Sequence, residues 1–242
     1  MNKSKLLTVR TPHWFDFIEE GDTAEIRIDG VIGESFFEED GTSARDFIAR
    51  LNSLSAPNLI VHINSPGGSV FDGFAIYNAL TASDKHVRVI VDGIAASIAA
   101  VIAMAGDEIV MPESSYLMIH YPCSICIGNS EKMIAEAATL DDLGKSIEKV
   151  FTDRSGAPLE KIQELMKGQP GADGTFISAD KALELKLCTE VEPNQIAAAA
   201  CAGLECLDFI PSALNKRTAD QTQPEANPDS FRNVFAEFHS NN

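Results

Sequence analysis

The chain has 242 residues, a formal net charge of −17 and an apolar fraction of 45%, values typical of a globular protein with one sizeable core. The acidic charge argues against nucleic acid and anionic membrane surfaces as partners, because both are bound through clustered Lys and Arg. Five irregularly spaced cysteines do not resemble a disulfide framework, and without a signal-peptide pattern or a membrane span we expect a cytoplasmic location.

Strand-like and helix-like segments alternate along the chain. Alternating residues or short apolar runs indicate strands, and apolar residues at helical spacing indicate helices. The predicted elements, in chain order, are a strand at 24–32, a helix at 43–54, a strand at 59–63, a helix at 71–82, a strand at 86–91, a helix from 97, strands at 108–111 and 116–120, and helices at 130–152, 158–167 and 179–186. This order predicts right-handed crossovers and a largely parallel sheet, hence an α/β fold.

The ends of the chain differ in composition from its middle. We divide the chain into an N-terminal segment at 1–23, a domain at 24–192 and a C-terminal tail at 193–242. The N-terminal segment is expected to be irregular, with Trp14 and Phe15 as anchors. The tail is polar and is expected to be largely disordered, although its last residues, FRNVFAEF, also fit a short amphipathic helix.

The most informative stretch is residues 87–106, where a β-branched run is followed by Asp92-Gly93 and then by small residues around one hydroxyl, Ser97. We interpret it as a buried strand, a tight turn and a buried helix with Ser97 at the helix N-terminus. Unpaired N–H groups there favour negative charge, which suits a nucleophile. The alternative is a core helix with a capping serine, since serine is a common N-cap.

A glycine pair lies in the segment NSPGGSV at 64–70, between a predicted strand and a predicted helix. Glycines permit backbone conformations that other residues resist, and such a pair can present N–H groups to an oxyanion. A phosphate-binding loop would need a Lys-Ser or Lys-Thr pair after its last glycine, and Ser69-Val70 stands there instead.

Histidine is the usual general base near neutral pH. His120 leaves an apolar strand for the loop Tyr121-Pro122 and is a candidate base, although a histidine at a strand end is also a common structural feature. His62 lies within a predicted strand, as a core histidine or a neighbour of the site. Cys123 and Cys126 form a CxxC-like pair without a second pair, so no metal site is predicted.

Together and in this order, four segments resemble the Clp protease proteolytic subunit family, the ClpP-like serine peptidases. The matching segments are INSPGGSVFDGFAIYNAL at 63–80, DGIAASIAAVIAMAG at 92–106, MPESSYLMIHYP at 111–122 and FISADKALELKL at 176–187. The sequence of the first segment is similar to that of the family branch found in phages and prophages. The resemblance implies a ClpP/crotonase-like spiral of ββα units with a protruding long helix.

The resemblance also implies a role for individual residues. Ser97 would be the nucleophile of a serine endopeptidase and His120 its general base, with the backbone N–H groups of Gly68 and Ile98 as the oxyanion hole. Gly67 and Ser69 would contact the polypeptide substrate. No cofactor and no metal are implied.

The third member of the triad is where this sequence departs from the family. The family places an acidic residue two positions before the aromatic that is Phe176 here, and that position is Gly174. Asp173 precedes it by one residue, in a loop that is longer than in relatives. Either the loop bulges so that Asp173 reaches His120, or another acid serves, or the site is a dyad or impaired.

The resemblance implies partners as well. Family members form heptameric rings that stack into a tetradecamer around a chamber, and the helix at 130–152 would contribute to the contact between rings. Further partners would be an AAA+ unfoldase or phage capsid proteins. The alternatives are a catalytically impaired ClpP-like assembly protein and a crotonase-type acyl-CoA enzyme, which would not need Ser97 and His120 in register.

Overall fold

The computed structural model describes residues 14–33 and 43–193. The chain divides into two compact units, Met1–Asn194 and Gln195–Asn242, and the second lies wholly outside the described residues. The expectations for the tail, for residues 1–13 and for two of the cysteines, Cys201 and Cys206, therefore also lie outside the described residues.

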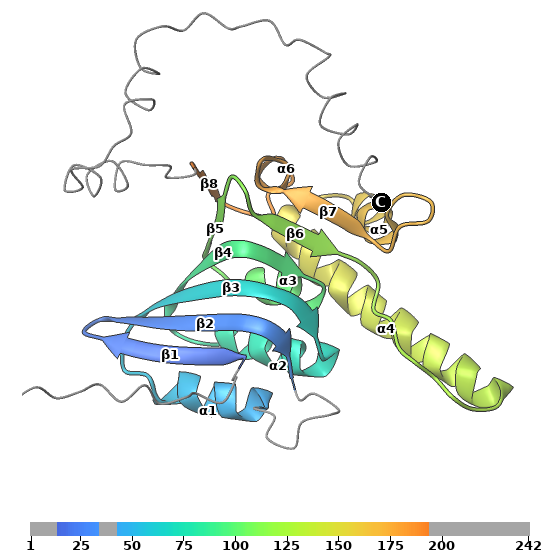
Figure 1. Ribbon diagram of the computed structural model, residues 1–242, viewed down its shortest axis with the longest axis horizontal. Coiled ribbons are helices and arrows are strands. Elements are labelled where there is room, and N and C mark those ends of the chain that lie inside the picture. Colours follow the sequence, from blue (N-terminus) through green and yellow to red (C-terminus); the bar gives the residue numbers. More distant parts are fainter. Residues whose placement is uncertain (1–13, 34–42, 194–242) are drawn as a thin grey trace, which may run out of the picture. The chain divides into compact units, whose positions relative to one another are not determined.

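The described part of the chain is a mixed α/β fold, as predicted (Figure 1). Its elements, in chain order, are β1 Phe15–Glu20, β2 Thr23–Ile32, α1 Ala44–Ser53, β3 Asn58–Gly68, α2 Val70–Thr81, β4 His86–Ala96, α3 Ile98–Ala103, β5 Glu108–Pro112, β6 Tyr116–Ile119, α4 Ser130–Ser155, α5 Leu159–Lys167, β7 Thr175–Ser178, α6 Ala179–Glu184 and β8 Glu190–Glu192. Within the described residues, the strands form one sheet of order β1-β2-β3-β4-β5-β8, and β6 pairs with both β4 and β7.

The sheet is largely parallel, as the alternating elements predict. β2, β3, β4 and β5 pair in parallel, while β1–β2 and β6–β7 are antiparallel. The first half of β4 pairs with β5 and its second half pairs with β6, at Ile94–Ala96. Because β4 changes neighbour in this way, its end is placed directly beside the end of β6.

One face of the sheet is covered by α1, α2 and α3 (Figure 1). Leu59, Val61 and Ile63 of β3 point to this face and are buried, whereas the alternate residue His62 is on the other side and half-buried. All six residues of α3 are buried, because a helix of small and apolar residues can lie between the sheet and α2. This packing fixes the residue that precedes α3.

Several local predictions differ from the structure, and strands β7 and β8 were not predicted. Residues 15–20 were expected to be irregular but form β1, whose Phe15 packs edge-on against Phe47 of α1. The glycine pair ends β3 rather than following it, because Gly67 and Gly68 still pair with Val31 and Ile32 of β2, after a register shift that follows Asp29. The tight turn predicted at Asp92-Gly93 is wrong: β4 runs through it to Ala96, since its second half has β6 as a new partner.

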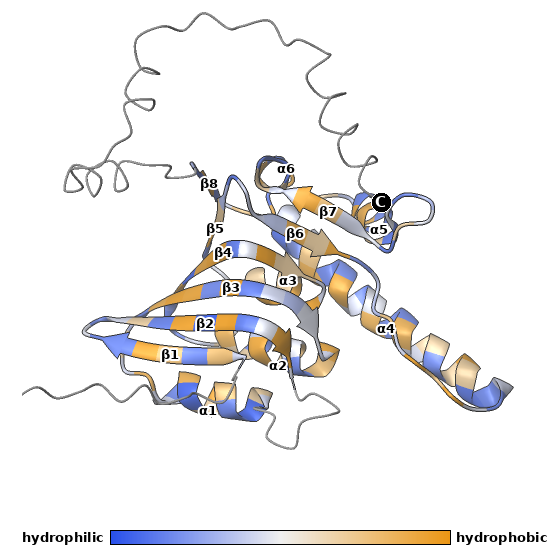
Figure 2. Cartoon of the chain, in the orientation of Figure 1, coloured by the Kyte–Doolittle hydropathy of each residue, from blue (hydrophilic) through white to orange (hydrophobic). Residues whose placement is uncertain are grey.

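The long helix α4 spans Ser130–Ser155, close to its predicted range. Ile147, Val150 and Phe151, in its second half, are buried as the pattern predicts. Its first half extends away from the sheet beside residues 121–129, with apolar residues along it (Figures 1 and 2). Met133 and Ile134 are exposed there, as are Ile125 and Ile127 of the preceding segment.

Candidate catalytic site

Ser97 occupies the junction between β4 and α3. It is the N-cap of α3, yet its side chain makes no capping hydrogen bond. Its backbone has φ 56° and ψ −126°, a strained conformation for a residue with a side chain. Its N–H donates to the carbonyl of Met118 in β6 at 2.8 Å. The structure therefore does not use Ser97 as a capping serine, and its hydroxyl is available for another partner.

That partner is His120, which follows the end of β6. Nε2 of His120 lies 2.8 Å from Oγ of Ser97, and only 12% of the histidine side chain is exposed. With the imidazole proton on Nδ1, the serine hydroxyl donates to Nε2. This is the geometry in which a histidine can remove the proton of a nucleophilic serine.

Gly67 lies directly against the serine. A methyl group at Gly67 would place its carbon 2.7 Å from Cβ of Ser97 and 2.8 Å from the carbonyl oxygen of Ala96. Gly67 also has φ +97°, a region that favours glycine. A glycine is therefore required at this position, because β3 approaches the serine too closely for any side chain.

The two predicted oxyanion-hole residues lie at the end of β3 and at the start of α3. Ile98 is the first residue of α3, so its N–H has no acceptor within the helix. Its nitrogen would be 3.2 Å from a methyl carbon at Gly67, so the nitrogen lies beside Gly67. Gly68 ends β3 and is exposed, with its Cα against the backbone of Ile32. Two backbone amides near a serine can stabilise a developing oxyanion.

The second ring nitrogen of His120, Nδ1, has a less well-defined partner. Nδ1 of His120 is buried and has no hydrogen-bond partner in the described part of the chain. Oδ2 of Asp173 lies 3.3 Å from it, which is close enough for an ion pair but not aligned as a hydrogen bond. The Asp173 side chain is 77% exposed. The loop before β7 thus brings Asp173 to His120, as one of the sequence alternatives expects, but in an exposed and loosely aligned position.

Gly174 explains why no acid stands at the family position. It is buried, has φ +88°, and a methyl group on it would overlap the carbonyl oxygen of Ile119 and Cβ of His120. Only a glycine fits against the histidine backbone in this loop. The loop therefore carries its carboxylate on the preceding residue, Asp173.

Serines on both sides of the glycine pair have structural partners. Ser69, predicted to contact substrate, caps α2 by accepting from the N–H of Asp72 at 3.4 Å. Ser65 was not singled out from the sequence. It is fully buried, donates to the carbonyl of Gly30 at 2.6 Å and accepts from the N–H of Gly67 at 3.0 Å. Ser65 therefore fixes the orientation of Gly67, and its place just before Pro66-Gly67 was the only sequence signal.

The remaining candidates lie apart from the serine. Nδ1 of His62 is 2.8 Å from Asp92, whose carboxylate is also 3.8 Å from Arg27, so this histidine is paired on the open face of the sheet. Cys123 and Cys126 are free cysteines. Within the described ranges, no group of three or more potential ligands is arranged to hold a metal.

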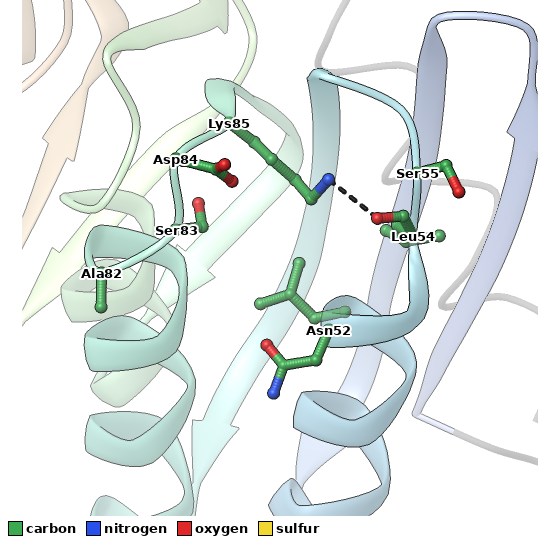
Figure 3. Close-up of a pocket in the computed structure, with 8 residues that line it drawn as sticks. Asn52, Leu54, Ser55, Ala82, Ser83, Asp84 and Lys85 are labelled. Atoms are coloured by element: carbon green, nitrogen blue, oxygen red, sulfur yellow. Dashed lines mark hydrogen bonds between the residues drawn. The ribbon is translucent and has the colours of Figure 1, made fainter.

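A hollow between the C-terminal ends of α1 and α2 contains none of the predicted site residues (Figure 3). Lys85 lies at its edge and donates to the carbonyls of Leu54 and Ala56 at 2.9 and 2.7 Å. These bonds join the segments that enter β3 and β4, which is a structural role. Among helices in the described ranges, none combines the length and apolar character needed to cross a membrane.

A serine hydroxyl at a strained junction with a histidine within hydrogen-bond distance, on an α/β fold, is an arrangement typical of nucleophilic hydrolases. Comparison with known families agrees with this class. The family model for Clp protease matches residues 36–195, about two-thirds of the chain. The chain therefore belongs to the Clp protease family.

Individual relatives give the same result. The chain is 36% identical over 105 residues to an ATP-dependent Clp protease proteolytic subunit of Pleurastrum terricola, a match that covers 42% of this chain and 53% of the relative. The subunit of the same name from Ligilactobacillus salivarius is 32% identical over 159 residues, covering 63% and 78%. That of Chlorella vulgaris is 31% identical over 136 residues, covering 55% and 65%. These matches favour neither the crotonase-type enzyme nor the impaired assembly protein.

Proposed function

We propose that the chain is a serine-type endopeptidase in which Ser97 is the nucleophile and His120 the general base. The observation that carries this proposal is the 2.8 Å contact between Nε2 of His120 and Oγ of Ser97. His120 accepts the serine proton as Ser97 attacks a peptide carbonyl, and it then protonates the leaving amine. Water hydrolyses the acyl-enzyme by the same route in reverse.

The backbone supplies the rest of the mechanism. The N–H groups of Gly68 and Ile98 donate to the oxyanion of the tetrahedral intermediate, which in other hydrolases is a large part of transition-state stabilisation. Asp173 stabilises the imidazolium that forms on His120, from the 3.3 Å position seen in the structure. Gly67 and Ser69 line the approach of the substrate backbone, where the lack of a side chain at Gly67 keeps the way to Ser97 open.

The proposal includes assembly. The relatives are named as proteolytic subunits of an ATP-dependent protease, and we propose that this chain likewise forms a homo-oligomeric chamber, as a heptameric ring or a tetradecamer. The exposed apolar residues of α4 and of the segment before it are available for contact with a second copy. An AAA+ unfoldase would feed substrates, and phage or prophage proteins are the substrates that we propose.

Hydrolysis of unfolded casein and of short chromogenic peptides tests the proposal. The wild-type protein should cleave both, and Ser97→Ala should lose at least about 10³-fold in rate, because removing a triad member leaves only the oxyanion hole and substrate binding. Ser53→Ala is a matched control at an exposed position at the end of α1, where the hydroxyl only bonds the carbonyl of Arg50, and its turnover should be that of the wild type. Equal rates in the wild type and Ser97→Ala would contradict the proposal.

A further inference from the structure

The residue after His120, Tyr121, is joined to α4 by a partly buried hydrogen bond. The hydroxyl of Tyr121 donates to Oε1 of Glu148 at 2.6 Å. Glu148 lies in the second half of α4 and is only 6% exposed. A buried carboxylate is costly unless it is hydrogen-bonded, so the bond from Tyr121 is what makes the burial of Glu148 tolerable. Neither residue belongs to the triad or to the oxyanion hole.

The ring of Tyr121 is seated on the helix as well. It lies against Gly144, where a methyl carbon would be 3.0 Å from Cδ1 of the ring. Gly144 and Glu148 are one helical turn apart, so they form one face of α4 that receives the ring and the hydroxyl together. Burial, and then the Glu148 carboxylate, raise the pKa of Tyr121 to about 12. The phenol therefore remains a hydrogen-bond donor throughout the neutral range.

Apart from the contact of its Nε2 with Ser97, His120 is positioned through the backbone on either side of it. Its Nδ1 has no hydrogen bond among the described residues, and the nearest carboxylate, on Asp173, is exposed and poorly aligned. On the N-terminal side, the carbonyl of Met118 accepts from Ser97. On the C-terminal side, the next residue is Tyr121. Small displacements of a catalytic group reduce turnover by large factors, so a fixed anchor at Tyr121 bears directly on His120.

We propose that Tyr121 and Glu148 are positioning residues of the Ser97–His120 site, whose hydrogen bond fixes the backbone at Tyr121 to α4 and so holds the neighbouring His120 in its catalytic placement. The inference rests on the proposed peptidase function. Its alternative is that the pair only stabilises the fold. The two roles predict different turnover per molecule of folded protein: a positioning role predicts a loss of kcat in folded variants, and a purely structural role does not.

Steady-state hydrolysis of a chromogenic peptide by three variants separates these possibilities. Tyr121→Phe keeps the ring on Gly144 and removes the hydroxyl, and it should lower kcat about 10- to 100-fold with KM within about twofold of the wild type. Glu148→Gln retains an acceptor for the hydroxyl and should stay within about threefold of the wild-type kcat. Lys149→Ala, which removes an exposed ion pair to Asp153 on the same helix, is the matched control and should leave kcat unchanged.

The double variant Tyr121→Phe/Glu148→Leu removes both polar partners and leaves no buried group unpaired. It should fold even where Tyr121→Phe does not, and it should keep the low kcat. A wild-type kcat in Tyr121→Phe or in the double variant overturns the inference, as does a loss in Glu148→Gln as large as in Tyr121→Phe. Absence of Ser97-dependent hydrolysis in the wild type would instead show that the proposed function itself is wrong.

Discussion

The contribution of Asp173 to catalysis can be worked out from its position. In a tightly bonded triad, replacing the orienting carboxylate reduces turnover by about 10⁴. Here the carboxylate is 77% exposed and lies 3.3 Å from Nδ1 of His120 without hydrogen-bond alignment. At a dielectric constant of about 80, its attraction to the imidazolium of the transition state is about 1.3 kcal/mol. Because 1.36 kcal/mol corresponds to tenfold in rate, Asp173→Asn should lower kcat only about tenfold.

The assay is peptide hydrolysis at two salt concentrations. Because an exposed charge is screened, raising the ionic strength to about 1 M should reduce the wild-type rate toward that of Asp173→Asn, while the variant itself should change little. Asp142→Asn is the control, since it removes an exposed carboxylate on α4. A loss near 10⁴ in Asp173→Asn would show that the loop closes on His120 during catalysis. An unchanged rate would show that Asp173 has no part in the reaction.

Three further predictions concern the surroundings of the site. Gly67→Ala should destabilise the fold by about 1–3 kcal/mol and lower kcat, because its methyl group would press on Ser97. Gly21→Ala is the control, since Gly21 also has a positive φ but lies in open space; it should lose stability in urea unfolding but not kcat. Gly174→Ala should lower kcat by displacing His120. Gly171→Ala is its control, because a methyl group there meets nothing within 4 Å. Equal activities in the two variants would contradict this steric argument. Since folding raises the pKa of the Tyr121 phenol to about 12, its contribution to the free energy of unfolding is complete below about pH 10 and is lost as the pH rises toward 12; urea unfolding from pH 8 to 11.5 should show this extra loss in the wild type and not in Tyr121→Phe.

Local patterns in the sequence predicted the α/β fold and most of its elements. Alternating apolar residues indicated β2, and helical spacing indicated α1 and α4. The pattern did not indicate β1, because its residues become a strand through pairing with β2 and through the contact of Phe15 with Phe47. It also ended β4 too early, since its second half is stabilised by β6, more than 20 residues further along the chain.

The candidate site also has features that the sequence predicted and features that only the structure shows. The small residues around Ser97 and the strand end at His120 were visible in the sequence, and the structure brings their side chains to 2.8 Å. The φ of 56° at Ser97 was not visible, and the approach of Asp173 to His120 was only one of several alternatives, because both depend on how segments far apart in the chain pack together. The pair Tyr121 and Glu148 was invisible for the same reason, being 27 residues apart.

Covalent labelling of Ser97 tests the proposed function most directly. A fluorophosphonate should modify the folded wild-type protein at Ser97, located by mass spectrometry of the labelled peptide, with one adduct per chain at saturation. His120→Ala should slow this labelling at least about 10²-fold, since the serine then lacks its base. No label at Ser97 in the folded wild-type protein, or an equal labelling rate in His120→Ala, would contradict the assignment of these two residues as nucleophile and base.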